Sequence, residues 1–402
     1  MSTKTPSAST PFEGESEFAL VNEPGGRFTV SRHSVLLIVG FVAVLAVASV
    51  RGADELPNQY EAGDIKVVAA RADEPVINLS VEKASQHLDH GAVAWSKQKK
   101  CVSCHTNGTY LFIRPALTAT LGAPLEETRT FFVDQLEALS KLGARKMRRS
   151  GTRPAQVIYI AAGLAEWDAH VSKKLSPETD KALRLTFELQ NKEGTWHSLT
   201  CWPPFESSAY QEAHMAAMAV ASAPGWTALL GEDDELRAKI DLLKKYIRET
   251  KPPHDYASVL QLWTSLRLDG VLNAEQQQAI VKLIRQKQKP DGGWSMRQFA
   301  TPEQWGGGNR AGKLREEPEF ETEPSDGHMT GLALLVLQEA GVSNDDAALQ
   351  QGLTWLRKNQ RESGRWWTRS LNTDKWHFIT YSGTAYPLLA LQRSSATRVT
   401  TD

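Results

Sequence analysis

The sequence predicts an all-α protein of about six helical hairpins behind an N-terminal transmembrane or signal segment. The main observation is a pattern, Gln-x3-Gly-x-Trp, that occurs at residues 190–196, 288–294 and 360–366. Each copy follows an amphipathic helix and precedes a more uniformly apolar one. A single hairpin of this kind cannot bury its apolar face alone, so the hairpins are expected to stack on one another.

The composition indicates a folded chain and argues against some classes of protein. Its 402 residues are 41% hydrophobic and 23% charged, which is enough apolar material for a buried core and argues against disorder. Lys and Arg (46) nearly balance Asp and Glu (47), and a net charge of −1 argues against nucleic-acid binding. The three cysteines are too few for a disulfide-stabilised scaffold.

The N-terminal part indicates export. Residues 1–33 form a polar leader, expected in the cytoplasm, and residues 34–50 form an apolar run without a charge. This run is short for a transmembrane helix and long for the apolar region of a signal peptide. Ala46 and Ala48 would allow cleavage, but the long leader favours an uncleaved anchor. The remainder is expected to face the periplasm from the inner membrane, or to be periplasmic if the segment is cleaved, with residues 51–83 as a linker.

The predicted repeat region covers residues 84–392 and leaves residues 393–402 as a tail. Residues 107–110 (Asn-Gly-Thr-Tyr) echo residues 193–196 (Glu-Gly-Thr-Trp), which places a first hairpin before the first full motif. A further, degenerate hairpin is expected at residues 132–165.

The helices that follow the three motifs are expected at residues 207–221, 328–339 and 380–391. Between the first two motifs, residues 236–247 and 257–268 form another predicted helix pair whose loop has lost the Gln and Trp. Residues 297–325 are rich in Gly, Pro and Glu and are predicted to be a loop insertion.

The three motifs resemble the QW repeat of squalene–hopene cyclases and of the related protein prenyltransferases. The resemblance covers residues 85–392 and is firmest for residues 178–392. It implies an α/α toroid, in which outer helices surround a ring of inner helices and a central cavity. The Asp-x-Asp-Asp acid of the cyclases and the zinc ligands of the prenyltransferases have no convincing counterpart here. The resemblance therefore implies a fold and leaves the activity open.

A second motif, Cys101-Val-Ser-Cys104-His105, has the form C-x-x-C-H and resembles the haem-attachment site of c-type cytochromes. The two thiols would bond to the haem, and His105 would be the proximal ligand of the iron. Such attachment takes place in exported proteins, so the predicted export is consistent with the motif. The motif therefore predicts one haem c, and a redox partner protein is expected with it. A Cys101–Cys104 disulfide and a metal site with histidine partners remain alternatives.

The sixth ligand of such a haem is less well indicated. Met147 lies in the basic run 145–149, a poor setting for a buried axial ligand. Loops that are equivalent by repeat are expected on one rim of the ring, and that rim would carry His197, His254 and His377. His197 is the first candidate for a sixth ligand, and an exposed loop histidine is the alternative.

The segment 201–215 supplies the remaining candidates. Tyr210 and His214 would share one helix face, which could point into the cavity. With Glu206 they are the acid/base candidates of an enzyme acting on a lipid or isoprenoid. The pairs His214-Met215 and His328-Met329 could bind iron or could simply belong to the core. Cys201 is expected to be a buried apolar residue.

Three functions are consistent with the sequence, and whether the protein is an enzyme stays open. The leading hypothesis is an exported, membrane-anchored toroid that carries one haem c and acts in electron transfer or redox-linked binding. The second is an enzyme acting on an isoprenoid or other lipid ligand in the cavity. The third is a non-catalytic binding scaffold with a Cys101–Cys104 disulfide.

Overall fold

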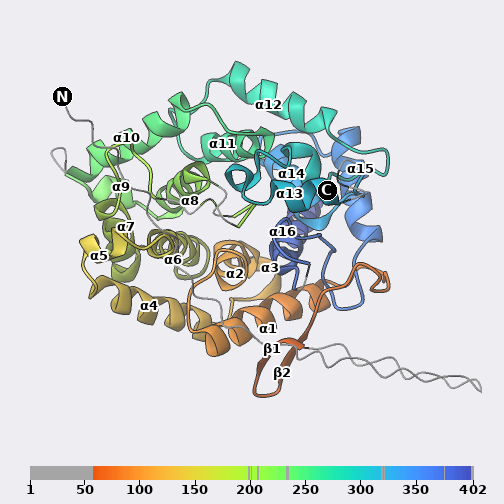
Figure 1. Cartoon of the computed structure of the whole chain (residues 1–402), viewed down its shortest axis with the longest axis horizontal. Coiled ribbons are helices and arrows are strands. Elements are labelled where there is room, and N and C mark those ends of the chain that lie inside the picture. Colours follow the sequence, from red (N-terminus) through yellow and green to blue (C-terminus); the bar gives the residue numbers. More distant parts are fainter. Residues whose placement is uncertain are drawn as a thin grey trace, which may run out of the picture. The chain divides into compact units, whose positions relative to one another are not determined.

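A computed structural model describes residues 58–197, 200, 202–205, 208–231, 235–317, 320, 322–374 and 376–399 (Figure 1). The leader at 1–33 and the apolar run at 34–50 lie outside these ranges. Within the residues that the structure describes, no helix is both long enough and apolar enough to cross a membrane.

The described chain folds into a closed ring of six helical hairpins, as Figure 1 shows, and the predicted all-α toroid is confirmed. The outer helices are α1 (Val81–Lys99), α4 (Glu126–Ser140), α7 (Pro177–Glu188), α10 (Glu235–Glu249), α12 (Ala274–Gln286) and α15 (Ala347–Lys358). The inner helices are α2 (Asn107–Ile113), α6 (Arg153–Trp167), α8 (Ala209–Ser222), α11 (Asp255–Arg267), α14 (Gly327–Glu339) and α16 (Ser382–Val399). The ring closes where α16 packs against α1 and α2.

Shorter elements lie between or before these helices. Strands β1 (Asn58–Ala62) and β2 (Ile65–Val68) pair antiparallel and pack on α1. The short helices are η1 (Arg114–Leu117), α3 (Thr118–Leu121), α5 (Ala144–Arg148), η2 (Asp168–Ser172), α9 (Trp226–Leu229), η3 (Met296–Phe299), η4 (Trp305–Gly308), α13 (Ala311–Glu316) and η5 (Phe378–Thr380). The strands lie where the sequence predicts a linker, because Tyr60 and Val67 are buried against the ring. At the other end, α16 continues past the predicted boundary at residue 392.

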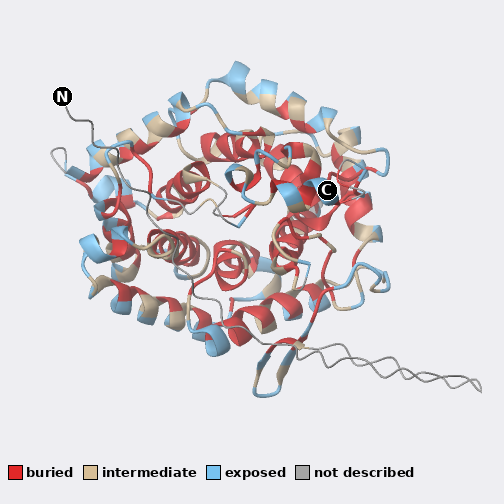
Figure 2. Ribbon diagram, viewed as in Figure 1, coloured by how far each residue is buried: buried red, intermediate tan, exposed pale blue. Residues whose placement is uncertain are grey.

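Burial distinguishes the two rings of helices (Figure 2). In the outer helix α10 the buried residues recur every three or four positions: Leu236, Ile240, Leu243 and Ile247. In the inner helix α14 every residue from Gly327 to Leu337 is buried. The amphipathic and the uniformly apolar sequences therefore correspond to the outer and inner positions.

The tryptophan of each repeat motif fastens the loop to the outer helix before it. All three indoles are buried, and each Nε1 donates a hydrogen bond to the carbonyl ten residues earlier, near the end of that helix. The bonds are Trp196 to Thr186 (2.8 Å), Trp294 to Ile284 (2.7 Å) and Trp366 to Leu356 (2.8 Å). The motif thus fixes the direction in which the chain leaves each outer helix.

The glutamine of each motif reaches the next hairpin. Its amide Nε2 donates to a carbonyl at the start of the following outer helix: Gln190 to Lys239 (3.0 Å), Gln288 to Ala348 (2.7 Å) and Gln360 to Ser80 (2.8 Å). Ser80 caps the N-terminus of α1, so the last motif bonds to the first hairpin. The same interaction that joins neighbouring repeats therefore closes the ring.

The glycine of each motif is required because the loop backbone lies very close to the next outer helix. Gly194, Gly292 and Gly364 all have φ near +90°, a region that side chains disfavour. A Cβ on Gly364 would lie 2.3 Å from the carbonyl oxygen of Lys83 in α1. The glycine therefore lets the loop backbone pack directly on the next outer helix.

Aromatic rings connect the inner helices inside the ring. Trp263 of α11 lies 5.7 Å from Phe112 of α2, 5.5 Å from His214 of α8 and 5.9 Å from Tyr386 of α16, between ring centroids. These contacts join helices of four different hairpins. The inner ring is thus held by one shared cluster as well as by neighbour contacts.

Candidate functional site

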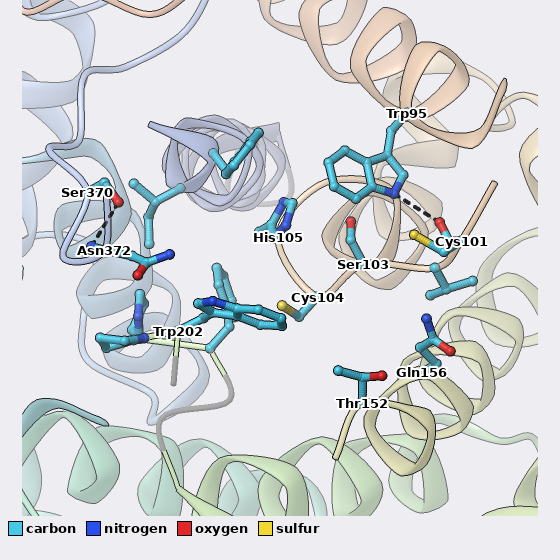
Figure 3. A pocket seen from close by; sticks show the side chains of 16 residues that line it. Trp95, Cys101, Ser103, Cys104, His105, Thr152, Gln156, Trp202, Ser370 and Asn372 are labelled. Atoms are coloured by element: carbon cyan, nitrogen blue, oxygen red, sulfur yellow. Dashed lines mark hydrogen bonds between the residues drawn. The ribbon is translucent and has the colours of Figure 1, made fainter. Parts of the chain in front are cut away.

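The C-x-x-C-H residues lie together in the wall of one cavity of about 480 Å³ (Figure 3). Cys101, Cys104 and His105 all line it. The other walls come from the segments before or at the start of α6, α8 and α16, so the cavity lies at the rim where the inner helices begin. This confirms that loops equivalent by repeat share one rim. A cavity of this size is in the range of small-molecule and cofactor sites.

The motif loop is held in place by Asn107, the first residue of α2. Its side-chain Oδ1 accepts a hydrogen bond from the Ser103 N–H (2.8 Å), and its Nδ2 donates to the Cys101 carbonyl (3.1 Å). Thr109 donates from its hydroxyl to the Cys104 carbonyl (2.7 Å). The loop is therefore fixed at the carbonyls of both cysteines and at the N–H of Ser103 between them. Sequence reasoning missed these two residues, although the Thr-Asn-Gly-Thr stretch directly after the motif was their signal.

Gly108 completes this turn. Its N–H donates to the Ser103 carbonyl (2.9 Å), and a Cβ at this position would lie 2.2 Å from the same oxygen. The first turn of α2 can therefore pack against the motif loop only with glycine here.

His105 is oriented by three neighbours. Its Nδ1 is 2.7 Å from the Thr106 hydroxyl, and its ring stacks on Phe378 (4.7 Å) and meets the edge of Trp95 (4.8 Å). Burial lowers the pKa of His105 to about 3, so the ring is neutral at physiological pH. With Nδ1 bonded to Thr106, Nε2 is the nitrogen left for a ligand. A neutral imidazole held by a hydrogen bond at its other nitrogen is the form that ligates metals.

Cys101 has a half-buried, free thiol, and its carbonyl accepts a hydrogen bond from Trp95 Nε1 (2.9 Å). Burial raises the pKa of the Cys101 thiol, so the sulfur is protonated at neutral pH. In Figure 3 the sulfurs of Cys101 and Cys104 lie apart in the wall of the cavity. In this structure the two cysteines are not joined by a disulfide.

The predicted sixth ligand is not brought to the cavity. His197 is exposed and does not line it. Met147 is fully buried in α5, also away from the cavity lining. His254 accepts a bond from the Ala257 N–H as the N-cap of α11, and His377 accepts one from the Ser370 N–H. Among the described residues that line the cavity, His105 is the single histidine, and no methionine is present.

Two of the three acid/base candidates, Tyr210 and His214, do not line the cavity either. The Tyr210 hydroxyl donates to the Ile247 carbonyl (2.9 Å), and His214 Nδ1 lies 2.7 Å from the Thr264 hydroxyl. Both side chains are buried between α8 and its neighbours and do not line this cavity. Glu206, like Cys201, lies outside the described residues.

The His-Met pairs also belong to the core. His328 Nδ1 lies 2.8 Å from the Ser382 hydroxyl, and its Nε2 lies 3.0 Å from the Tyr256 hydroxyl. Both ring nitrogens are therefore occupied. Across the described ranges, no group of three His, Cys, Asp or Glu side chains is arranged to hold a metal ion.

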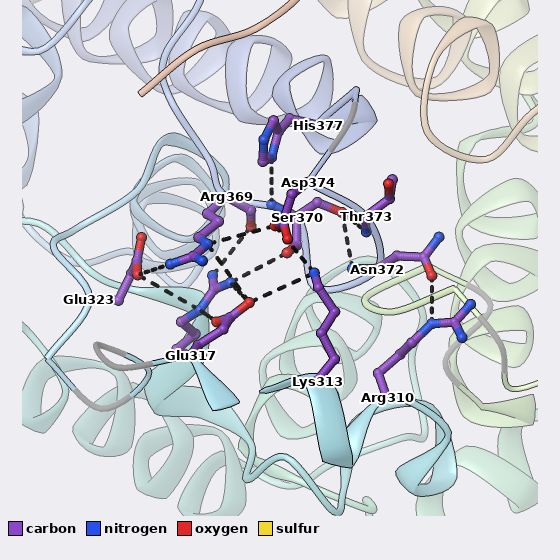
Figure 4. Close-up of polar contacts among 11 residues, drawn as sticks. Arg310, Lys313, Glu317, Glu323, Arg369, Ser370, Asn372, Thr373, Asp374 and His377 are labelled. Atoms are coloured by element: carbon purple, nitrogen blue, oxygen red, sulfur yellow. Dashed lines mark hydrogen bonds and ion pairs between the residues drawn. The ribbon is translucent and has the colours of Figure 1, made fainter. Parts of the chain in front are cut away.

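One wall of the cavity is held by a charged cluster that sequence reasoning did not find (Figure 4). The buried Arg297 pairs with Glu317 (2.9 Å) and donates to the Ser370 carbonyl (3.4 Å), while Arg310 donates to the Asn372 side chain (2.7 Å). Ser370 and Asn372 line the cavity. The insertion at residues 297–325 therefore positions the loop that faces the C-x-x-C-H motif.

Comparison with known proteins bears on the fold. Residues 254–396, which run from the N-cap of α11 into α16, match the family model of the squalene-hopene cyclase C-terminal domain. No curated protein matches the chain. The matched part contains the second and third repeat motifs and the charged cluster, and it excludes the C-x-x-C-H loop. Residues 254–396 of this chain are therefore squalene-cyclase-like.

Proposed function

We propose that the toroid carries one covalent haem c in the cavity at its rim and acts in electron transfer or redox-linked binding. Cys101 and Cys104 would be the attachment points, and His105 the proximal ligand. The observation that carries the proposal is that these three side chains line a single cavity. When bound, a haem c supplies one-electron transfer.

The cavity walls suit a porphyrin. Val102, Trp202, Phe205 and Ile379 give the lining an apolar character that matches a flat aromatic ligand. The amides of Gln156 and Asn372, together with the Ser370 hydroxyl, offer hydrogen-bond donors at the same wall. Such donors could bind the carboxylates at the polar edge of the ligand.

The chain's own residues prepare the ligand histidine. Burial keeps His105 neutral, so no proton has to be removed before Nε2 binds iron. Thr106, Phe378 and Trp95 fix the ring, which lowers the entropy lost on ligation. Because the described lining holds no second histidine and no methionine, we expect His105 to be the single protein ligand.

Export belongs to the same proposal. Covalent haem attachment of this type takes place outside the cytoplasm, and the apolar run at residues 34–50 would direct the chain there. We propose that the toroid faces the periplasm, either on an inner-membrane anchor formed by this run or free after its cleavage.

The test is expression of the full chain in the periplasm together with a c-type cytochrome maturation system. We expect a haem-staining band that survives denaturing electrophoresis, and a Soret absorption in the purified protein. The double variant Cys101→Ala/Cys104→Ala should lose the covalent stain, and His105→Ala should shift the Soret band.

Cys201→Ala is the matched control, because it removes the cysteine outside the motif and should leave the stain unchanged. Far-ultraviolet circular dichroism of each variant confirms that the ring is folded. A wild-type protein that folds and is exported, yet carries no covalent haem, would exclude the proposal.

A further inference from the structure

A cluster of cations lies beside the mouth of this cavity. Four basic side chains line an open surface cleft of about 740 Å³, and none of its described lining residues is a carboxylate. We call this surface the basic shelf: Arg145, Lys146, Arg149 and Arg153. The first three are exposed and Arg153 is partly exposed. In a chain of balanced charge, such a cluster is a local excess.

The shelf is not neutralised by the rest of the described structure. None of its side chains forms an ion pair with a described carboxylate, whereas nearby cations do: Arg129 pairs with Glu178 (3.2 Å), and Lys181 pairs with Glu137. The positive potential of the shelf is therefore directed to solvent, where it can attract a negatively charged partner.

The backbone of the shelf is fixed. Met147 between its cations is fully buried, and Arg148 donates to the Glu188 carbonyl at the end of α7. The Ser150 hydroxyl oxygen accepts a hydrogen bond from the Arg153 N–H (3.3 Å). A partner that binds here meets a surface that is already formed, so little backbone order has to be gained on binding.

The shelf and the cavity share the start of α6. Thr152 and Gln156, which flank Arg153 in the sequence, both line the cavity that contains Cys101, Cys104 and His105. A partner bound to the shelf would therefore contact the segment that also forms part of the wall of the proposed haem site.

We infer that the basic shelf is the docking surface for an acidic protein. Three features favour this partner. The cations are exposed and spread over an open cleft instead of converging on one buried point, as they would for a small anion. No exposed large hydrophobic residue of the described chain lies in residues 142–153, and a membrane-inserting surface would need some. Exposed charges of one sign steer a complementary protein surface and allow rapid dissociation.

This inference rests on the proposed function only for the nature of the partner, which would be the redox partner of the haem. The docking itself can be tested without haem. The probe is a fluorescein-labelled oligoglutamate peptide, and binding to the full chain is followed by fluorescence anisotropy from low salt to about 0.15 M ionic strength.

The test variant is Arg145→Glu/Lys146→Glu/Arg149→Glu. The matched control, Lys66→Glu/Lys282→Glu/Lys358→Glu, makes the same change in net charge at exposed lysines outside the shelf that form no ion pair with a described carboxylate. We expect wild-type binding that weakens with salt, a loss of affinity of about tenfold or more in the test variant, and little change in the control.

Absence of peptide binding by the wild type would overturn the inference, and so would an equal loss in both variants. Stronger binding to phosphatidylglycerol vesicles than to the peptide would assign the shelf to a membrane instead. For haem-loaded protein, the salt-dependent rate of reduction by an acidic ferredoxin should fall in the test variant alone. A negative haem stain with positive peptide binding would refute the proposed function and leave the docking surface intact.

Discussion

Asn107 holds the C-x-x-C-H loop in place, although its own side chain does not line the cavity. Its amide satisfies one group on each side of the loop, and it is fully buried. Such a buried amide contributes more to stability than its own hydrogen bonds, because its removal also leaves backbone groups of the loop without partners. It fixes the part of the loop between Cys101 and Ser103.

Replacement of Asn107 by Ala is expected to lower the free energy of unfolding by about 1–3 kcal/mol, because buried polar groups lose their partners. Urea unfolding of the variant measures this loss. Asn58→Ala is the control, since the Asn58 amide bonds only to an exposed Glu61 carboxylate, and it should change stability by at most about 0.5 kcal/mol. Equal stability of the two variants would show that the loop does not depend on Asn107.

At the scale of elements, the Gln-x3-Gly-x-Trp motif is a joint between hairpins. The tryptophan fixes the loop to the outer helix before it, and the glutamine and glycine fix it to the outer helix after it. The same set of contacts joins neighbouring hairpins along the chain and also joins the last outer helix, α15, to the first, α1. Its residues are therefore structural, and they explain the fold without indicating an activity.

Gln360→Ala should open this closure. We expect a loss of about 1–2 kcal/mol in unfolding free energy, because the Ser80 and Gly364 carbonyls lose a buried donor. Amide hydrogen exchange should increase at the start of α1. In the matched variant Gln288→Ala, whose amide bonds to Ala348, exchange should increase at the start of α15 instead. An unchanged exchange pattern in both variants would exclude this role for the motif.

For the whole molecule, the sequence predicts the repeats and places the C-x-x-C-H residues in the loop of the first hairpin, but it does not predict the cavity around them. The hydrophobic spacing of a helix and the repeat motif each lie within a short stretch of sequence, so both can be recognised from the sequence alone. The wall at Ser370 depends on Arg297, far away in the chain, and no local pattern shows that contact. The surroundings of His214 have the same origin, because its Nδ1 lies against the Thr264 hydroxyl on another helix.

The end of the ring away from the cavity is closed by a shared ion cluster. Each inner helix starts at the cavity rim, so the C-terminal ends of α6, α11 and α14 meet at the other end. There Arg267 pairs with Glu166 (3.0 Å) and Glu339 (2.7 Å), and Arg393 also pairs with Glu339. Burial raises the pKa of Glu339, but the bonds from Arg267 outweigh this effect and hold the pKa at about 2. One guanidinium therefore joins three hairpins across the ring.

Arg267→Met is expected to cost about 3 kcal/mol of unfolding free energy, because the buried Glu166 and the partly buried Glu339 lose their shared cation while Glu339 keeps Arg393. Arg285→Met, which breaks a more exposed pair with Asp346, should cost at most about 1 kcal/mol. Adding Glu166→Gln and Glu339→Gln to Arg267→Met should restore much of the loss, since neutral amides tolerate burial without a cation. Urea unfolding separates the two outcomes. Without this rescue, the cost would come from the lost stacking of the Arg267 guanidinium on Trp263 (Cζ lies 5.3 Å from the ring centroid) and not from its ion pairs.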